Sequence, residues 1–279
     1  MGKAPAGPRH TSTPAGAEDA LRADNVVIRF GGLVAVNDVS FVIPKLSVVS
    51  LIGPNGAGKT TFFNILTGLY RPTSGRVTLD GRDVTGRPPH RIAEMGLART
   101  FQNIRLFNLM TAEENVMVAM HSHLQAGIVG TIFGSPRKRR EEREAREFAA
   151  ELLDFVGIAK TRYEYARNLS YGDQRRLEVA RALALRPSVL LLDEPTAGMN
   201  PQESGVFTDF VYRIRDQRDL SVLLIEHDMT VVMRVSERIT VLDRGEVIAE
   251  GSPDDIRTNE RVVEAYLGKA ATDQARGGA

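Results

Sequence analysis

Two kinds of apolar pattern alternate along the chain. Short and nearly continuous apolar runs, typical of buried strands, occur at Val48–Ile52, Val189–Leu192 and Ser221–Ile225. Segments with apolar residues at helical spacing lie between them, as in Thr60–Leu69 and Glu141–Val156. This mixture of strands and helices predicts an α/β fold.

An antiparallel β region is expected before and after the first buried run, because β-like segments there are paired across short turns. The pairs are Val26–Phe30 with Val34–Ile43 across Gly31-Gly32, and Arg76–Leu79 with Arg82–Val84 across Asp80-Gly81.

Helical character dominates the middle of the chain. Pro88-Pro89 opens a helix at about His90–Met95, and Gly96–Gln102 is predicted to be a strand that ends on a polar residue. From there to about Leu169 the pattern is helical, with a capping box that begins at Thr111. We therefore predict a helical subdomain, at about residues 103–170, inserted into the α/β core.

Composition narrows the classes of function. The 279 residues carry 36 Lys and Arg against 35 Asp and Glu, and this net charge of +1 gives no reason to expect a nucleic-acid partner. The absence of cysteine excludes disulfides and thiolate metal sites, which suits a reducing compartment. No apolar run approaches the about 18 residues that a membrane-spanning helix needs, so a membrane role would require a partner.

The two ends of the chain are expected to be flexible tails around one domain at residues 23–268. Residues 1–22 are rich in Ala, Gly, Pro, Ser and Thr and contain no apolar core of a signal peptide. Residues 269–279 form the second tail.

A glycine-rich segment directly after Val48–Ile52 carries the strongest chemical signal. It fits the phosphate-binding pattern Gly-x4-Gly-Lys-[Ser/Thr], which wraps phosphates with backbone N–H groups and a helix N-terminus. The glycines permit positive φ and close backbone approach, the lysine brings a charge to the β- and γ-phosphates, and the first threonine can ligate Mg²⁺. A chance turn is disfavoured by the strand before it. The segment is Gly53-Pro54-Asn55-Gly56-Ala57-Gly58-Lys59-Thr60-Thr61.

Two adjacent carboxylates, Asp193 and Glu194, follow the apolar run Val189–Leu192. Ligands of open α/β sheets bind at the carboxyl ends of strands, so these acids are expected beside the phosphate loop. We assign Asp193 to holding Mg²⁺, directly or through water, and Glu194 to activating the attacking water as general base. The alternative, a plain helix cap, is less consistent with a neighbouring phosphate loop.

Three further features complete the candidate site. Ser170 and Asp173 form a Ser-x-x-Asp capping box, whose exposed helix start can contact a second phosphate, although most capping boxes only cap helices. His227 follows the strand Ser221–Ile225; an isolated histidine there is usually structural, but its place in a chain with the other phosphate-site parts favours a functional role. Gln102 is a neutral amide at a strand end, suited to reaching Mg²⁺ or water.

In this order the motifs resemble the full series of the ATP-binding cassette (ABC) transporter ATPases, from about Leu21 to Gly268. The matching positions are Gly53–Thr61, Gln102, Leu169–Gln174, Leu190–Glu194, Pro201 and His227. The resemblance implies a P-loop NTPase core that binds and hydrolyses ATP with Mg²⁺.

The resemblance also implies that two ATPase domains pair head to tail. Each ATP would then lie between one chain's phosphate loop and the partner chain's Ser170–Gly172 segment. It further implies that Phe30 stacks on adenine, that Gln102 links the site to a membrane partner, and that His227 contacts the γ-phosphate. Lys59, Gln102, Glu194 and His227 are thus the expected catalytic residues, and Thr60, Gln102 and Asp193 the expected metal ligands.

Within this family, four segments look like the ATPase subunits of branched-chain amino acid importers. They are Gly96–Phe107, Tyr171–Arg176, Ala197–Pro201 and Ala265–Gly268. Subunits for urea uptake and lipopolysaccharide export are the alternatives within the same branch, and a nucleotide-gated module without hydrolysis is the alternative outside it.

The expected partners are permease subunits, a second ATPase subunit, identical or related, and indirectly an extracytoplasmic solute-binding protein. The chain would thus lie at the cytoplasmic face of the membrane as a peripheral protein. Three departures from the family pattern stand out: Tyr171-Gly172-Asp173 replaces Gly-Gly-Gln, Asn200 replaces the usual Asp, and Leu46-Ser47 replaces a Gly-Glu pair.

Overall fold

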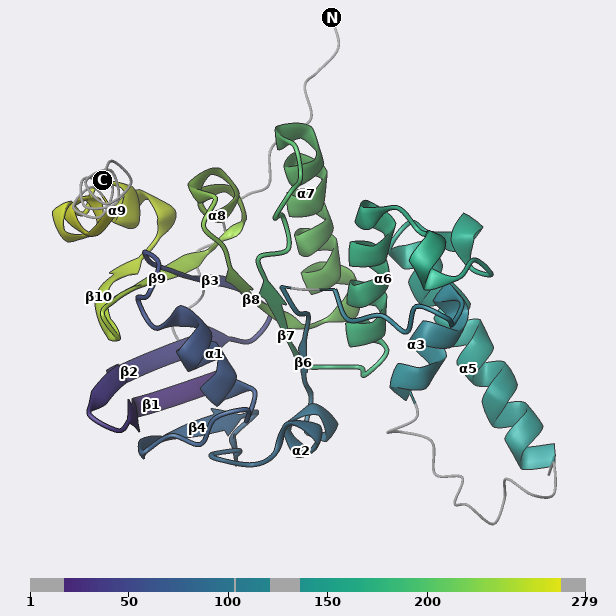
Figure 1. Cartoon of the computed structure of the whole chain (residues 1–279), viewed down its shortest axis with the longest axis horizontal. Coiled ribbons are helices and arrows are strands. Elements are labelled where there is room, and N and C mark those ends of the chain that lie inside the picture. Colours follow the sequence, from purple (N-terminus) through teal and green to yellow (C-terminus); the bar gives the residue numbers. More distant parts are fainter. Residues whose placement is uncertain (1–17, 103, 121–135, 267–279) are drawn as a thin grey trace, which may run out of the picture.

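The computed structural model describes residues 18–102, 104–120 and 136–266. Two sheets and the helices around them make up this part of the chain (Figure 1). Most of the first predicted tail and all of the second lie outside the described residues. Within the described ranges, no helix is both long and apolar enough to cross a bilayer.

The first sheet is antiparallel, as the two predicted hairpins require, and its strand order is β2-β1-β4-β5. Its strands are β1 (Asp19–Phe30), β2 (Leu33–Pro44), β4 (Ser74–Leu79) and β5 (Arg82–Asp83). The prediction that residues 1–22 form a tail is wrong at its end, since β1 begins at Asp19. Leu21 is fully buried and is paired with Ile43, so apolar burial extends the strand before Val26.

The second sheet has six strands in the order β10-β9-β3-β8-β7-β6. All neighbours pair in parallel except β9 and β10, which form an antiparallel edge. The strands are β3 (Val48–Ile52), β6 (Leu97–Arg99), β7 (Val189–Asp193), β8 (Ser221–Ile225), β9 (Arg238–Asp243) and β10 (Glu246–Gly251). The parallel pairing brings the carboxyl ends of β3, β7 and β8 to one edge.

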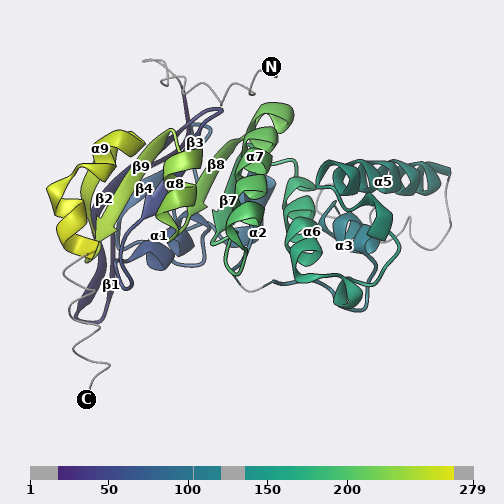
Figure 2. The same ribbon diagram turned by 90° about the horizontal axis from the view of Figure 1, so that it is seen from above.

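Helices cover both faces of the six-stranded sheet, which explains why its strands are apolar on both sides. In β7, Val189 and Leu191 pack toward α1 and the antiparallel sheet, whereas Leu190 and Leu192 belong to the core under α6 and α7. Figure 2 shows α7 and α8 along this second side. The core helices are α1 (Lys59–Leu66), α2 (Pro89–Glu94), α6 (Tyr171–Leu183), α7 (Pro201–Arg218), α8 (Met229–Val235) and α9 (Pro253–Arg257).

A group of helices lies at one end of the molecule, beside α6 (Figures 1 and 2). It contains α3 (Ala112–Met120) and α5 (Pro136–Phe155), followed by the short 3₁₀ turns η2 (Ala159–Thr161) and η3 (Ala166–Asn168). The predicted capping box is present: Thr111 N–H donates to Glu114 Oε2 at 2.8 Å, and Glu114 N–H donates to Thr111 Oγ1 at 3.2 Å. The limits of a separate subdomain at 103–170 stay a prediction.

Several predicted helix and strand limits are corrected by local chemistry. The helix expected over Thr60–Leu69 ends at Leu66, because Gly68 has φ of +74° and breaks the helical path. The long charged helix begins at Pro136 and not at Glu141. The predicted strands that precede the phosphate loop, the two acids and His227 are all present.

Candidate active site

The phosphate loop connects the fully buried strand β3 to helix α1. The first two residues of the loop, Gly53 and Pro54, are buried. Lys59 Nζ donates to their carbonyl oxygens at 2.5 and 3.1 Å. Gly53 has φ of +149°, and a Cβ there would lie 2.1 Å from Leu242 O. The loop is therefore packed so tightly against β9 that this position admits only glycine.

A cavity of about 540 Å³ opens over the loop. All loop residues from Asn55 to Thr61 line it, together with Glu194 and Ile225 from the ends of the neighbouring strands. The structure therefore brings the predicted phosphate loop and the predicted general base to one cavity. Sequence reasoning missed four lining residues, which belong to no motif: Leu33, Val34, Ala35 and Arg244.

The two carboxylates after β7 have different surroundings. Asp193 is buried, and its Oδ2 accepts from Arg99 Nη2 at 2.9 Å in an ion pair whose side chains are both 11% exposed. Arg99 also donates to Asn64 of α1 at 2.8 Å. Asp193 is thus fixed between β6 and α1. Its cationic partner was missed because nothing in the sequence pairs residues so far apart.

Glu194 is held at the edge of the cavity in a strained backbone conformation. Its φ is +45°, which is uncommon for a residue with a side chain. Its N–H donates to Ile225 O at 2.9 Å, and its Oε2 accepts from Gln102 Nε2 at 2.8 Å. The side chain is therefore aimed by contacts with β8 and with the Gln102 segment.

His227 lies beside this carboxylate, as its position after β8 predicts. Its Nδ1 is 3.9 Å from Glu194 Oε1 and 3.8 Å from Glu226 Oε2, and its side chain is 64% exposed. Glu226 itself was missed by the sequence reasoning. It is buried and accepts from Thr196 N–H at 2.9 Å, so it fixes the turn that follows Glu194.

The prediction that Gln102 ends a strand is wrong, because β6 stops at Arg99. Thr100 N–H still donates to Leu191 O of β7, but the backbone then leaves the sheet. Phe101 N–H donates to Glu178 Oε1 of α6 at 3.1 Å, and Phe101 O accepts from Arg175 Nη1 at 2.8 Å. Side chains of α6 therefore replace the strand partner, and Gln102 reaches Glu194 from a loop.

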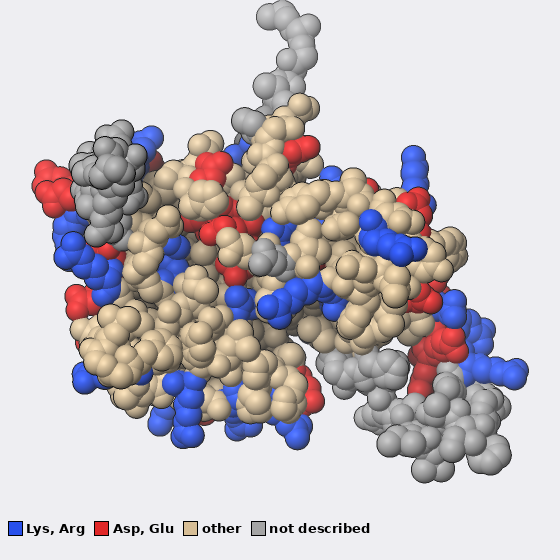
Figure 3. Space-filling model, in the orientation of Figure 1, with Lys and Arg blue, Asp and Glu red and all other residues tan. Residues whose placement is uncertain are grey.

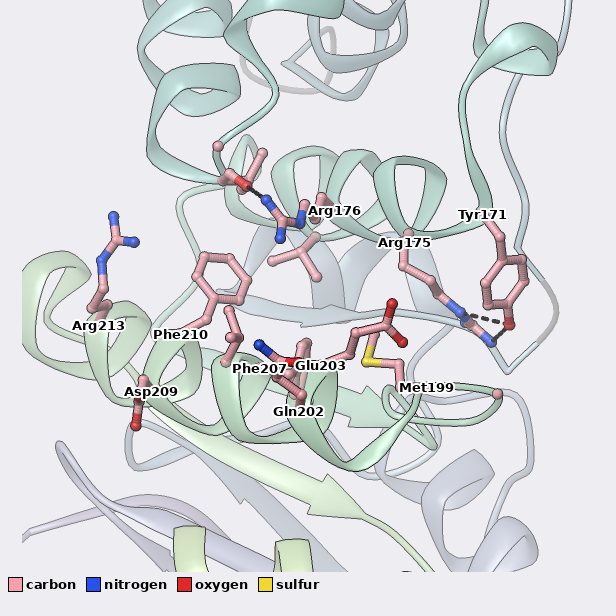
Figure 4. A pocket seen from close by; sticks show the side chains of 16 residues that line it. Tyr171, Arg175, Arg176, Met199, Gln202, Glu203, Phe207, Asp209, Phe210 and Arg213 are labelled. Carbon is pink, nitrogen blue, oxygen red and sulfur yellow. Dashed lines mark hydrogen bonds between the residues drawn. The ribbon is translucent and has the colours of Figure 1, made fainter.

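The Ser170–Gly172 segment begins α6 and does not line the cavity over the phosphate loop. Ser170 Oγ accepts from Asp173 N–H at 3.2 Å, which provides the side-chain cap of the predicted capping box. Tyr171 and Gly172 instead line a second cavity between α6 and α7, together with Met199 (Figure 4). Within one chain, the two predicted phosphate-binding parts are therefore separate.

Phe30 is the last residue of β1, directly before the predicted turn, and is 46% exposed. Its ring meets that of Tyr70 edge-on, with 5.4 Å between centroids. Neither ring lines the cavity over the loop, so adenine stacking on Phe30 stays a prediction. The departure at Asn200 has a structural account: Asn200 and Glu203 form a reciprocal capping box at the start of α7.

The predicted metal ligands suit a hard cation that takes oxygen ligands. Thr60 offers a hydroxyl in the cavity. Asp193 offers a carboxylate at the end of β7, where Oδ2 is paired with Arg99, and Gln102 offers an amide whose nitrogen donates to Glu194. Among the described residues there is no group of three His, Cys, Asp or Glu able to hold a metal alone. The donors present fit Mg²⁺ whose remaining ligands are phosphate and water oxygens.

A parallel α/β core with a phosphate loop after one strand and acidic residues after the next strand but one in the sheet defines a P-loop nucleotide-hydrolysing protein. A family model described as "ABC transporter" matches residues 36–197, which is more than half of the chain. A second, "Branched-chain amino acid ATP-binding cassette transporter", matches residues 246–272. The chain therefore belongs to the ABC transporter family, and it is an ATPase that hydrolyses ATP as a transporter subunit.

Curated relatives of nearly the same length support this assignment. The chain is 49% identical to the high-affinity branched-chain amino acid transport ATP-binding protein BraF of Pseudomonas aeruginosa, over 90% of this chain and 98% of that protein. It is 46% identical to LivG of Escherichia coli, with the same coverage. The lipopolysaccharide export ATP-binding protein LptB of Haemophilus influenzae is 34% identical, over 89% of this chain and 97% of that protein.

Solved structures confirm the fold. The ADP conformation of MJ1267, an ATP-binding cassette of an ABC transporter, superposes with a TM-score of 0.78 at 30% identity. The alignment covers 90% of this chain and 99% of MJ1267. A dimeric structure of the cassette MJ0796 superposes with a TM-score of 0.71 at 27% identity, covering 84% and 98% of the two chains.

Proposed function

We propose that this ATPase powers the uptake of branched-chain amino acids through membrane permease subunits. The observation that carries the chemical part is the position of Glu194, which lines the phosphate-loop cavity and accepts from Gln102 at 2.8 Å. The substrate is supported by relatives named for branched-chain amino acid transport, which at 46–49% identity exceed the 34% of the lipopolysaccharide exporter subunit.

Each side chain in and beside the cavity has a distinct task in this proposal. Lys59 exchanges its contacts with the loop carbonyls for the β- and γ-phosphates and neutralises charge that develops during transfer. Glu194 accepts a proton from the attacking water, and His227, 3.9 Å from it, contacts the γ-phosphate. When bound, Mg²⁺ supplies charge neutralisation at the phosphates, held by Thr60 and Asp193 with Gln102 nearby.

We further propose that catalysis requires a second ATPase subunit, which can be an identical or a related chain. Ser170 and Gly172 are exposed at the start of α6 but lie outside their own chain's phosphate cavity. A partner's nucleotide would use the positive end of α6, which lies at an accessible surface. The dimeric arrangement of MJ0796 supports such a pairing.

An exposed apolar patch on the helical end is the proposed docking surface for the permease. It is built from two neighbouring segments, since Ala112 N–H donates to Glu164 O and Ala166 N–H donates to Met110 O. The patch is formed by Phe107, Leu109, Tyr163 and Tyr165, all at least 44% exposed. On the face shown in Figure 3, acidic and basic side chains are interspersed, and neither sign of charge dominates.

This docking would place the chain at the cytoplasmic face of the membrane as a peripheral protein. An extracytoplasmic solute-binding protein would then act on it only through the permease. Replacing Tyr163 and Leu109 by Ser should release the chain from membranes that contain the permease, while ATP binding by the soluble chain stays normal. Unchanged co-sedimentation with those membranes would contradict the assigned surface.

The test of the catalytic assignment is Glu194→Gln in the full chain assembled with its permease. The amide keeps the shape and can still bond to Gln102, but it cannot accept the proton from water. We expect ATP affinity within twofold of the parent and turnover lowered at least about a hundredfold. Glu94→Gln, at an exposed position of α2, is the matched control. Near-normal hydrolysis by Glu194→Gln would overturn the general-base assignment.

The substrate is tested separately in vesicles that contain the assembled transporter. Uptake of labelled leucine, isoleucine or valine should require ATP and should be lost with Glu194→Gln. ATP-dependent movement of urea or lipopolysaccharide instead would assign the chain to another branch of the family, with the ATPase chemistry unchanged.

A further inference from the structure

A buried arginine in the second turn of α6 holds the backbone of the Gln102 segment. Arg175 is 6% exposed, and its guanidinium donates to Phe101 O at 2.8 Å and to Gln102 O at 2.5 Å. The planar fork of a guanidinium suits two adjacent acceptors, which a lysine cannot bind in the same way.

Glu178, about one turn further along α6, completes this contact from the same side. Its Oε1 accepts from Phe101 N–H at 3.1 Å, and its Oε2 lies 3.4 Å from Arg175 Nη1. Both the N–H and the C=O of Phe101 are thus bound by α6. Burial raises the pKa of Glu178, so the contact is maintained despite an unfavourable desolvation of the carboxylate.

The other end of this connection is at the proposed general base. The backbone of Gln102 is bound to Arg175, while its side-chain amide donates to Glu194 Oε2 at 2.8 Å. A displacement of Arg175 therefore moves the group that orients Glu194. Misplacement of a catalytic group by about 1 Å can lower a rate by about a hundredfold.

Arg175 is also tied to the exposed start of its own helix. The Tyr171 hydroxyl lies 2.9 Å from Arg175 Nη2 and 3.2 Å from Nε, and Figure 4 shows the ring beside the guanidinium. Tyr171 is 51% exposed and lies between Ser170 and Gly172. A molecule that contacts this segment therefore meets a side chain that is one hydrogen bond away from Arg175.

A purely stabilising role accounts poorly for this arrangement. Buried ion pairs contribute little net stability, and well-packed apolar residues often replace them without loss. We propose that Arg175 is a positioning residue that holds Gln102 against Glu194, and that the Tyr171 hydroxyl connects this hold to the Ser170–Gly172 segment. The proposal rests on the proposed role of Glu194 in activating water.

The kinetic test compares Arg175→Met with Arg176→Met in the assembled transporter. Arg176 is the next residue of α6, is exposed and faces the cavity between α6 and α7. We expect Arg175→Met to lower kcat about tenfold or more with KM within twofold. The kcat of Arg175→Lys should lie between those of Arg175→Met and the parent. Arg176→Met should match the parent.

A double-mutant cycle asks whether Arg175 acts through Gln102. In a Gln102→Ala background, Arg175→Met should cause little further loss of turnover, because the group that it positions is already absent. An equally large, additive loss in that background would overturn the proposal. Tyr171→Phe keeps the ring and removes only the hydroxyl, so it provides a milder test if Arg175→Met folds poorly; we expect it to lower kcat about threefold.

Amide hydrogen exchange provides a readout that does not depend on catalysis. In the nucleotide-free full chain, Arg175→Met should accelerate exchange at Phe101 N–H, whereas Arg176→Met should not. Unchanged exchange at Phe101 N–H in Arg175→Met would overturn the proposal that Arg175 holds the Gln102 segment. Two results together separate this proposal from the assigned general base. If Arg175→Met accelerates exchange at Phe101 while Glu194→Gln still hydrolyses ATP, Arg175 does hold the Gln102 segment, and only the role of Glu194 is rejected.

Discussion

The two helix starts expected to meet phosphate, those of α1 and α6, are built in different ways. α1 starts at Gly58, which has φ of +99° and makes no side-chain cap bond. α6 starts at Ser170, whose hydroxyl accepts from Asp173 N–H. A Cβ on Gly58 would lie 2.7 Å from Ala35 O, whereas a Cβ on Gly172 would have no heavy atom within 4 Å.

This difference separates two reasons for a glycine in a motif. At Gly58 the surrounding chain and the left-handed backbone explain the residue completely. At Gly172 nothing in the described part of this chain does, and glycine inside a helix even costs about 0.5–1 kcal/mol relative to alanine. The proposed shared nucleotide site would explain a glycine at position 172, because a partner's nucleotide would occupy the space that a Cβ would enter.

Among the changes that test this comparison, the largest effect is expected from Gly58→Ala, which tests the internal requirement. The new methyl group clashes with Ala35 O and strains the backbone, at a cost of about 1–3 kcal/mol. ATP affinity, measured by titration with a fluorescent analogue, should fall at least about tenfold as the loop shifts. Gly32→Ala, in the exposed turn after β1, is the control; normal ATP affinity in Gly58→Ala would show that the loop adapts.

Gly172→Ala should have the opposite profile. We expect the isolated chain to unfold at an equal or slightly higher temperature and to bind ATP normally, because the alanine meets no neighbour and favours the helix. In the assembled transporter, turnover should fall about tenfold as the methyl group blocks a partner's nucleotide. Full turnover there would remove the main support for a shared site.

The sequence predicted the parts of the site that depend on local order along the chain. Strand β3, the loop and helix α1 are neighbours, and the acids at Asp193 and Glu194 follow a short apolar run that is typical of a buried strand. Parallel pairing then brings these ends together without further information. The predicted residues Lys59, Glu194 and His227 accordingly meet at one edge.

Contacts between elements that lie far apart in the chain could not be predicted from the sequence. Arg99 pairs with Asp193, Arg175 binds Phe101 and Gln102, and Glu226 fixes the turn at Thr196, yet each partner lies in another element. A charged residue in an amphipathic helix looks the same whether it is solvated or buried against a loop. For this reason, the end of β6 was also placed three residues too late.

The side-chain cap at the start of α6 is a further difference from α1, which has none. A smaller effect is expected from Ser170→Ala, which removes this cap. Losing a cap of this kind costs about 1 kcal/mol, and urea unfolding of the isolated chain should show this loss. Ser170→Thr retains the hydroxyl and should recover most of the stability. A loss well below 0.5 kcal/mol, compared with the usual range of about 0.5–2, would mean that water replaces the cap.

The two helices also differ in charge, because α1 contains no acidic residue, whereas α6 contains the buried carboxylate Glu178. The smallest expected effect concerns this carboxylate. Burial raises the pKa of Glu178 above its ordinary value of 4.5, although the hydrogen bond from Phe101 and the charge of Arg175 oppose this rise. From pH 4.5 up to the folded pKa, the native state therefore binds more protons than the unfolded chain. The contribution of Glu178 to stability must then decrease as the pH rises through this window.

The difference in unfolding free energy between the parent and Glu178→Gln isolates that contribution, because other titrating groups cancel. We expect the difference to become less favourable to the parent as the pH rises from 4.5, and to level off once Glu178 is ionised in both states. A series of urea unfolding curves at increasing pH measures it. A trend in the opposite direction would mean that Arg175 and the Phe101 amide outweigh desolvation, and that the hold of α6 on the Gln102 segment is strongest when Glu178 is charged.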